Sequence, residues 1–263
     1  MRRLLAVYTL WWREQVRFFR QRSRVLGAFV QPLMFWALFG AGLQASFHPP
    51  TGGRDMSSLE YFFPGTVIMI LLFTAIFSTI SVIEDRKEGF LQGVLVAPVP
   101  RSAIVLGKIL GGTTLALVQG TVLLALGPLV GIRMTLAVFL EAVAIQFLVA
   151  FALTALSFCL AWRMDSTQGF HAVMTVLLLP MWLLSGAFFP VHGVPIWLAW
   201  VMHINPLTYG TAALRRILYT GEESLPPDLP GLWISLLATA AFALVTLVLA
   251  SFLARRRSAG AKG

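Results

Sequence analysis

Residues 60–88 read EYFFPGTVIMILLFTAIFSTISVIEDRKE, an apolar run followed by five charged residues. The apolar part, 60–83, exceeds the roughly 20 residues that a helix needs to cross about 30 Å of hydrocarbon. The charged part is dense for a chain in which only 12% of residues are charged. Prolines follow it at positions 98 and 100. This order predicts a membrane-spanning helix and then a compact polar segment, residues 84–101, that contacts another molecule in water.

The composition of the whole chain indicates one integral membrane domain, residues 1–263. Hydrophobic residues make up 58% of it and the mean hydropathy is +0.81, above the roughly 45–50% apolar content of soluble domains. The net charge of +9 does not indicate nucleic-acid binding, because the basic residues lie at the ends of apolar runs and are not interleaved with stacking aromatic residues. The single cysteine, Cys159, excludes an intrachain disulfide framework.

The apolar runs predict an all-α fold with six membrane-spanning helices. We expect these helices at about 25–46, 60–83, 103–130, 136–161, 169–188 and 230–253. The basic N-terminus lacks the short apolar core of a cleavable signal peptide, so the first span is expected to be retained and to direct insertion.

Residues 2–22 predict an amphipathic helix in the membrane interface. Apolar and aromatic residues recur at three- and four-residue steps from Leu4 to Phe19, and arginines follow the same period on another face. Tryptophans on one side and arginines on the other suit a helix in the headgroup plane. The alternative is a solvated basic helix that packs on a soluble partner.

Residues 189–207 are apolar but are interrupted by prolines, histidines and a glycine. They are too short and too broken for a full span beside the fifth helix. We expect two short helical pieces that dip into the outer leaflet, with their open backbone groups buried in protein. Asn205 is expected to cap the following helix, and Pro206 to occupy its first position.

Lysine and arginine residues are unevenly distributed about the six spans. Of the 20 such residues, only Arg54, Arg133, Arg215 and Arg216 fall on one side. Because cytoplasmic loops carry the excess of positive charge, we expect both termini, the 84–101 segment and the tail 255–263 in the cytoplasm. The chain is expected to be a multi-pass protein of the plasma (inner) membrane.

The sequence carries no signature of catalysis or of a bound cofactor. A nucleotide-binding phosphate loop needs glycines followed by a lysine and a hydroxyl residue, but Gly107-Lys108 is followed by Ile109. The four histidines lack the spacing of metal ligands. Ser185-Gly186 does not fit an intramembrane serine protease, because residue 183 is leucine rather than glycine. We therefore expect no metal in this chain, and any ATP hydrolysis on another chain.

Glu141 is an ionisable residue inside a predicted span. A carboxylate at membrane depth normally faces a partner or a watery cavity, which makes Glu141 a candidate for a translocation path. The plainer interpretation places it in the first turns of its helix, near the outer interface.

Two glycine pairs, Gly107 with Gly111 and Gly127 with Gly131, have the four-residue spacing that lets helix backbones approach closely. The spacing does not say whether the partner helix belongs to the same chain or to a second copy.

Two blocks of sequence carry a resemblance to a known family. The first block consists of Glu84, Gly89, Pro98, Pro100, Arg101, Gly107 and Lys108. The second consists of Ser185-Gly186, Phe188-Phe189-Pro190, Pro195, Trp197, Asn205-Pro206-Leu207-Thr208-Tyr209 and Arg215. Their order and spacing resemble those of the permeases of type-2 ATP-binding-cassette (ABC) exporters, the group that includes drug-, polysaccharide- and lipid-exporting permeases. The six-span plan of that family covers nearly the whole chain.

The resemblance implies a permease dimer, homodimeric or heterodimeric, paired with two cytoplasmic ATPase subunits that bind ATP and Mg. It implies that residues 84–101 form a coupling helix seated in the ATPase. The residues implied in this contact are Glu84, Asp85, Arg86, Lys87, Glu88, Phe90 and Leu91. The residues implied in an exit gate within 189–207 are Pro190, Pro195, Asn205 and Pro206. The alternative for residues 84–101 is a solvated loop that only sets the topology.

The expected function is therefore the permease subunit of an ATP-driven exporter that moves an amphipathic or lipid-like substrate, such as a drug, a lipid or a glycan, by alternating access. A secondary, ion-coupled transporter is the alternative, although its midplane ion site normally needs more intramembrane polar residues than Glu141. An integral-membrane enzyme is a weaker alternative, because the sequence lacks a paired catalytic constellation. Membrane lipids are expected partners, and nucleic acid is not.

Overall fold

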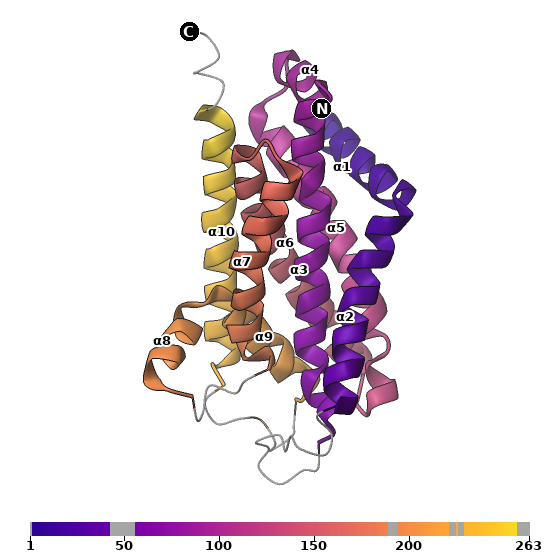
Figure 1. Cartoon of the computed structure of the whole chain (residues 1–263), viewed down its shortest axis with the longest axis vertical. Helices are drawn as coiled ribbons and strands as arrows, with labels where there is room; N and C mark the ends of the chain where they lie inside the picture. The colour runs from indigo at the N-terminus through magenta and orange to yellow at the C-terminus, as the bar shows by residue number, and fades with distance from the viewer. Residues whose placement is uncertain (1, 43–55, 189–193, 221–224, 226–228, 257–263) are drawn as a thin grey trace.

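The computed structural model describes residues 2–42, 56–188, 194–220, 225 and 229–256. Within these ranges every regular element is a helix (Figure 1), which confirms the all-α prediction. The elements are α1 Arg2–Arg20, α2 Arg22–Gly42, α3 Ser58–Lys87, α4 Phe90–Val96, α5 Arg101–Leu124, the 3-10 turn η1 Gly127–Val130, α6 Leu136–Arg163, α7 Thr167–Trp182, the π-helical turn η2 Leu183–Ala187, α8 Ile196–Ile204, α9 Pro206–Leu218 and α10 Leu232–Arg256.

Five helices in the described part of the chain are long and apolar enough to cross a membrane: α3, α5, α6, α7 continued by η2, and α10. They match five of the six predicted spans. The remaining prediction, at about 25–46, falls on α2. The apolar stretch of α2, Val25–Leu38, is shorter than the others, and positions 43–46 lie outside the described residues. The sixth span therefore stays a prediction.

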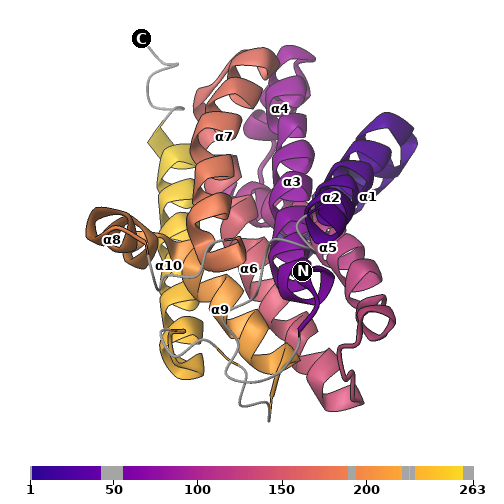
Figure 2. The same cartoon turned by 60° about the horizontal axis from the view of Figure 1, so that its bottom comes forward.

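Helix α3 is the centre of the bundle. It contains 30 residues, which at about 1.5 Å each extend over roughly 45 Å. Helices α2, α5, α6 and α7 pack against it (Figure 2), and its side chains from Tyr61 to Leu72 are all buried. In contrast, α6, α7 and α10 keep exposed apolar side chains such as Leu140, Val176 and Leu244. Such faces suit helices that border lipid.

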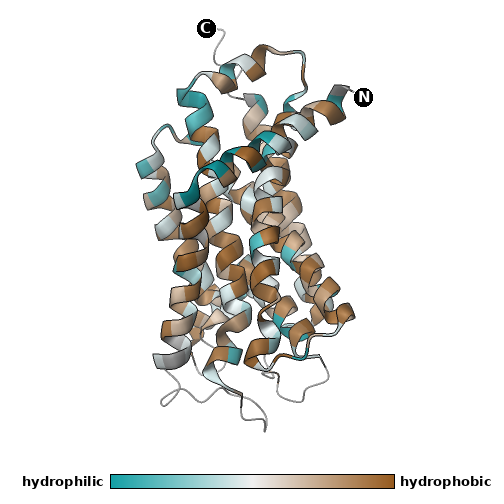
Figure 3. Cartoon of the chain, turned by 90° about the vertical axis from the view of Figure 1, so that its right-hand side faces the viewer, coloured by the Kyte–Doolittle hydropathy of each residue, from teal (hydrophilic) through white to brown (hydrophobic). Residues whose placement is uncertain are grey.

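The two ends of the bundle differ in their elements and polarity. Helices α1 and α4 and the last turn of α10 lie at one end, which we call the α4 end, while α8 and α9 lie at the other, the α8 end (Figure 1). Hydrophilic residues gather toward the α4 end, where α1 crosses the bundle (Figure 3).

The segment 84–101 is divided rather than being one compact helix. Residues 84–87 continue α3 without a break. Gly89 then adopts φ +78°, the left-handed backbone that glycine permits at a helix end. Helix α4 follows, and Pro98 and Pro100 lead into α5.

The predicted span at 103–130 ends earlier than expected. The α-helix stops at Leu124, and residues Gly127–Val130 form the tighter turn η1. Gly131 closes this turn with φ +94°, a conformation that strains other residues. The glycines at 127 and 131 thus shape a turn rather than a helix-packing surface.

The break predicted within 189–207 lies at Asn205. Helix α8 ends before it, and α9 begins at Pro206 and continues to Leu218, well beyond the predicted segment. The side chain of Asn205 accepts a hydrogen bond from the Leu207 amide at 3.1 Å, and Pro206 occupies the first helical position. Both local predictions are confirmed. Residues 189–193, which include Pro190, lie outside the described residues.

The other glycine pair seats α1 on α5. A Cβ atom at Gly107 would lie 2.8 Å from the Leu10 Cβ, and one at Gly111 would lie 2.8 Å from the Glu14 Cβ. Real Cβ atoms do not approach so closely, so the absence of side chains lets the two helices meet. This pair therefore packs within one chain.

We expect Gly107→Val to displace α1 from α5. The new side chain collides with Leu10, and overpacking of this kind costs about 1–3 kcal/mol of folding free energy. The melting temperature of the purified chain in one detergent should fall by about 2–12 °C. The matched change Gly42→Val, at a helix end with no neighbour within 4 Å among the residues that the structure describes, should leave it unchanged. Equal melting temperatures for the two variants would contradict this packing.

Candidate functional site

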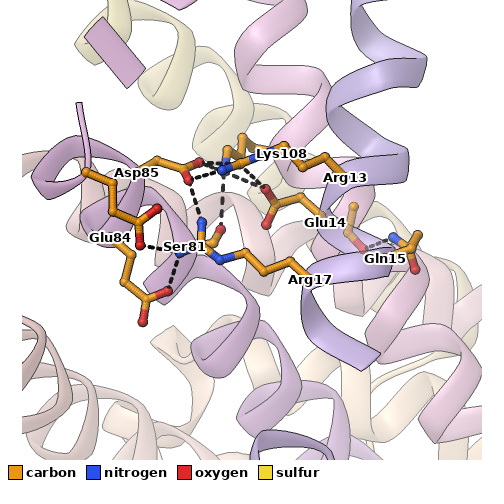
Figure 4. Close-up of polar contacts among 10 residues, drawn as sticks. Arg13, Glu14, Gln15, Arg17, Ser81, Glu84, Asp85 and Lys108 are labelled. Atoms are coloured by element: carbon orange, nitrogen blue, oxygen red, sulfur yellow. Dashed lines mark hydrogen bonds and ion pairs between the residues drawn. The ribbon is translucent and has the colours of Figure 1, made fainter. Parts of the chain in front are cut away.

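Asp85 is the centre of a network of charged side chains at the α4 end (Figure 4). Its side chain, on the last turn of α3, is 0% exposed. Arg13 of α1 donates to both carboxylate oxygens, from Nη1 to Oδ2 at 2.8 Å and from Nη2 to Oδ1 at 2.7 Å. Arg17 of α1 and Lys108 of α5 donate to the same carboxylate. One carboxylate on α3 thus joins α1 to α5.

Lys108 is the second buried charge of this network. Its Nζ donates to Glu14 Oε1 at 2.5 Å and to Ser81 Oγ at 3.3 Å, in addition to Asp85. The side chains of Lys108 and Glu14 are almost fully buried. A single buried charge is strongly unfavourable, whereas a hydrogen-bonded group of opposite charges is tolerated. Removal of any one buried member of the network would therefore leave another charge buried without a partner, which is unfavourable.

The network extends toward the surface through Arg17 and Arg13. Arg17 Nη2 donates to Glu84 Oε2 at 2.8 Å and to Glu88 Oε1 at 3.2 Å. The guanidinium carbon of Arg13 lies 3.6 Å from the centre of the Phe90 ring, a cation–π contact. Because Phe90 begins α4, helix α1 contacts both the last turn of α3 and the first turn of α4.

Arg13 is a permanent cation in this network. Burial alone lowers the pKa of its guanidinium, but the hydrogen bonds and charge of Asp85, with the charges of Glu14 and Glu88, raise that pKa above its ordinary value. Arginine is charged at every physiological pH, so the positive charge beside Asp85 is constant.

Arg86 joins the same turn of α3 to α6. It donates to the carbonyl oxygens of Trp162 at 2.6 Å and Met164 at 2.8 Å, and to the carboxylate of Asp165 at 2.9 Å. These carbonyls lie at the C-terminal end of α6, where backbone acceptors have no partner within the helix. A cation is favourable at this end of the helix dipole.

A groove of about 440 Å³ lies between α1 and α4; we call it the α1–α4 groove. Its walls are mostly apolar and come from Ala6 and Leu10 on one side and from Phe90, Val94 and Val99 on the other. An apolar groove with charged side chains at its edge is typical of a protein-binding surface.

Comparison with known proteins identifies the family of this chain. The family model described as "ABC-2 type transporter" matches residues 6–219. The chain belongs to the ABC-2 type transporter family. This agrees with the resemblance noted in the sequence, and the match includes the charged network and both blocks of residues that carry that resemblance.

Relatives of this ABC-2 chain are named as transport proteins. The transport permease ycf38 of Cyanophora paradoxa is 29% identical over 78% of this chain and 71% of its own length. The multidrug ABC transporter permease YbhR of Escherichia coli K12 is 32% identical over 67% of this chain, and ABC transporter G family member 20 of Dictyostelium discoideum is 30% identical over 65%. The alignments cover 48% and 23% of those two relatives. Family and helices together indicate a multi-pass transmembrane subunit of an ABC transporter.

The residues predicted to contact an ATPase are not on one surface of this ABC-2 chain. Asp85 and Leu91 are buried, and Phe90 lies beneath Arg13. Leu91 therefore packs inward, whereas Phe90 is half-buried and lines the α1–α4 groove beside Arg13. The reason is that α4 is a short helix that lies against the bundle and turns its first residues toward it.

The charged residues of the same segment are also divided. Glu84 and Arg86 are partly buried and bonded within the chain, whereas Lys87 and Glu88 are exposed. Val96, the last residue of α4, is 86% exposed and lies on the side of that helix that faces away from the bundle.

The break between α8 and α9 is closed by polar side chains. Asn205 Nδ2 donates to the Met181 carbonyl at 2.6 Å, and Thr208 Oγ1 donates to the Met202 carbonyl at 2.6 Å. Pro195 stands immediately before α8. Thr208 thus provides a partner for a carbonyl in the last turn of α8, and Asn205 joins the break to α7.

Glu141 is exposed at the sixth residue of α6, close to the α8 end. This position agrees with the plainer interpretation, in which Glu141 lies in the first turns of its helix. Within the described residues, no group of three or more histidine, cysteine, aspartate and glutamate side chains is arranged to hold a metal ion.

The sequence did not reveal the partners in the network. Arg13 and Arg17 were expected on the face toward lipid headgroups or a partner, Glu14 was given no role, and Lys108 was only part of a motif. The sequence did contain one usable signal: Asp85 and Lys108 lie at or inside the ends of apolar spans. Charges in such positions require partners of opposite sign. Arg215 was also unassigned; it is buried on α9, with its guanidinium carbon 4.3 Å from the centre of the Tyr61 ring.

We expect Asp85→Asn to destabilise the α4 end. Removing one member of a buried ion pair costs about 3–5 kcal/mol, because its partners stay buried without a counter-charge. The melting temperature should fall, and proteolysis within α1 should become faster. Glu84→Gln, at a partly exposed carboxylate, should cost about 1 kcal/mol or less.

A second substitution tests the origin of that loss. Lys108→Met removes a cation that Asp85→Asn leaves partly unpaired, so the double variant should recover part of the lost stability. An Asp85→Asn protein as stable as wild type, or a double variant whose losses simply add, would contradict the proposed balance of charges.

Proposed function

We propose that this chain is the permease subunit of an ATP-driven exporter in which a separate cytoplasmic ATPase subunit binds ATP and Mg. Family membership supports a transport subunit, and the α1–α4 groove supports an ATPase contact. The groove combines apolar walls with nearby side chains of both charges, the composition expected of a protein interface. A second permease copy and a second ATPase complete the proposed transporter.

In this proposal the ATPase binds the groove and the exposed side of α4. A force on α4 reaches the core because Phe90 contacts Arg13 and Arg13 binds Asp85 of α3. Helix α3 is continuous from this turn to the α8 end, so a displacement of its last turn moves the whole helix. Movement of α3 in the two copies then alternates access between the two sides of the membrane.

The α4 end faces the cytoplasm of a plasma (inner) membrane in this proposal, and both termini lie there. The excess of lysine and arginine at this end supports the orientation. Helix α2 supplies the sixth span, and α1 lies along the cytoplasmic membrane surface.

The substrate path runs between the two permease copies. Helix α7 supports this assignment, because its exposed side carries Gln168, His171 and Thr175 in an otherwise apolar helix, and such side chains are unfavourable against lipid. The α8–α9 break with Pro195, Asn205 and Pro206 forms the exit. An amphipathic or lipid-like substrate, such as a drug, a lipid or a glycan, suits a path bordered by both polar and apolar side chains.

Val96→Asp should weaken ATPase binding at least tenfold. Val96 is exposed at the end of α4, beside the α1–α4 groove, and a carboxylate buried there by the ATPase must be desolvated without a partner. The measurement is co-purification of the proposed ATPase subunit, together with transport in vesicles. Val96→Thr, which keeps the shape without the charge, is the matched control. If Val96→Asp retains the ATPase and transports at the wild-type rate, the proposed surface is wrong.

Cysteine labelling tests the orientation. In a Cys159→Ala background, Leu129→Cys in η1 should react with an impermeant maleimide applied to intact cells, and Val96→Cys should react only in inverted vesicles. Both side chains are more than four-fifths exposed, so differences in reaction report membrane side. The reverse pattern would invert the proposed orientation, and labelling of both from one side would contradict a bundle that spans the membrane between them.

A further inference from the structure

A second pocket lies on the other side of Arg13, between α1 and the end of α3. It has a volume of about 610 Å³, and we call it the α1 pocket. The side chains important to the argument are Trp12, Val16, Arg17, Arg20, Gln21 and Glu88. The apolar wall of the pocket consists of Trp12 and Val16 of α1. The polar wall consists of arginines of α1, Gln21 and Glu88, the C-cap residue of α3.

The polar wall offers unused donors and acceptors. Within the described residues Arg20 makes no ion pair or side-chain hydrogen bond, although it is exposed beside the pocket. The Gln21 Oε1 atom is buried and has no hydrogen-bond partner in the described part of the chain, which is unusual for a buried acceptor. The Glu88 carboxylate is 59% exposed and contacts Arg17 at 3.2 Å. Among the residues described, a ligand here meets the unpaired cation of Arg20, the unpartnered Gln21 acceptor and a carboxylate that is bonded to Arg17 but still exposed.

The pocket is lined by charges of both signs. Its cations are Arg13, Arg17 and Arg20 and its anion is Glu88, and Arg13 and Arg17 already pair with carboxylates of the chain. A purely anionic ligand gains attraction from Arg20 but meets repulsion from Glu88. A ligand that carries both charges satisfies the two sides at once.

The apolar wall continues onto the outer face of α1. Leu5, Tyr8, Trp12 and Phe19 recur at helical spacing, and each is more than half exposed. A tryptophan between a polar pocket and an apolar face is typical of the membrane interface, where its ring contacts both hydrocarbon and headgroups. Acyl chains therefore extend naturally from the α1 pocket along this face.

We propose that the α1 pocket binds the phosphoethanolamine headgroup of a membrane phospholipid. The phosphate accepts hydrogen bonds from Arg20, and the ammonium donates to Glu88 and to Gln21 Oε1. A primary ammonium has three N–H donors, whereas the trimethylammonium of phosphatidylcholine has none. The proposal rests on the interfacial position of α1 given under Proposed function. It links the lipid to Glu88, the residue at the end of α3, and so makes the α1–α3 contact dependent on lipid composition.

The test uses the full chain without an ATPase, so that ATPase coupling does not enter the result. Binding is measured by native mass spectrometry and by lipid-dependent melting temperature in nanodiscs of phosphatidylethanolamine, phosphatidylcholine or phosphatidylglycerol. We expect phosphatidylethanolamine to bind about tenfold more tightly than either other lipid. Arg20→Gln should remove most of the binding, whereas Arg22→Gln, an exposed arginine outside the pocket, should not.

Two further experiments test which side chains bind the ammonium and whether the ligand is a lipid or a soluble phosphate compound. Gln21→Leu and Glu88→Gln should each lower the preference for phosphatidylethanolamine over phosphatidylcholine at least threefold, and melting temperatures in lipid-free detergent check that both variants fold. Inorganic phosphate and free phosphoethanolamine, added at millimolar concentration, should not displace the lipid.

Three outcomes would overturn the proposal. Equal affinity for the three lipids would show only general lipid contact, and tighter phosphatidylglycerol binding would show simple attraction to anions. Displacement by inorganic phosphate would show a soluble-anion site instead of a lipid site. The cysteine-labelling experiment tests the proposed orientation separately. A failure of the lipid proposal can therefore be distinguished from a failure of the proposed orientation.

Discussion

The burial of Asp85 is the constraint on which the α4 end of the bundle depends. A carboxylate removed from water is stable only beside cations in good hydrogen-bond geometry, and these cations come from α1 and α5. To bring Arg13 within reach, α1 must cross close to α5. Gly107 and Gly111 permit that approach because any side chain at these positions would collide with α1. One buried charge and two glycines thus determine the position of the first helix.

Helix α3 is held at both of its ends by interactions with other helices. At the α4 end Asp85 binds α1 and α5. At the α8 end Arg215 of α9 lies against the Tyr61 ring, and the Tyr219 hydroxyl donates to the Glu60 carbonyl at 2.7 Å. Between these points α3 is one unbroken, largely buried helix. A packed helix shifts between discrete positions rather than bending freely, which is why we place the coupling between ATPase and exit on α3.

Helix α1 has three different faces, and each has its own environment. Glu14 and Gln15 face α5 and bond to it, Ala6 and Thr9 border the α1–α4 groove, and Tyr8 and Trp12 face outward. Its charged side is therefore partly internal, in contrast to an ordinary interfacial helix whose charges face the headgroups. A helix in contact with the core, the proposed ATPase surface and the proposed lipid site is suited to combine signals from partner and membrane.

The sequence by itself determined the membrane class, the five long spans, the cap at Asn205 and the family, because apolar length, turn residues and local motifs depend on neighbours along the chain. It also located the segment 84–101, but not the environment of each side chain within it. Only the tertiary structure decided that Asp85 pairs with α1 and α5, that Leu91 is buried, and that Gly107 packs within one chain. Periodicity shows that a helix has a distinct face, but which face of another helix meets it depends on residues far away in the sequence.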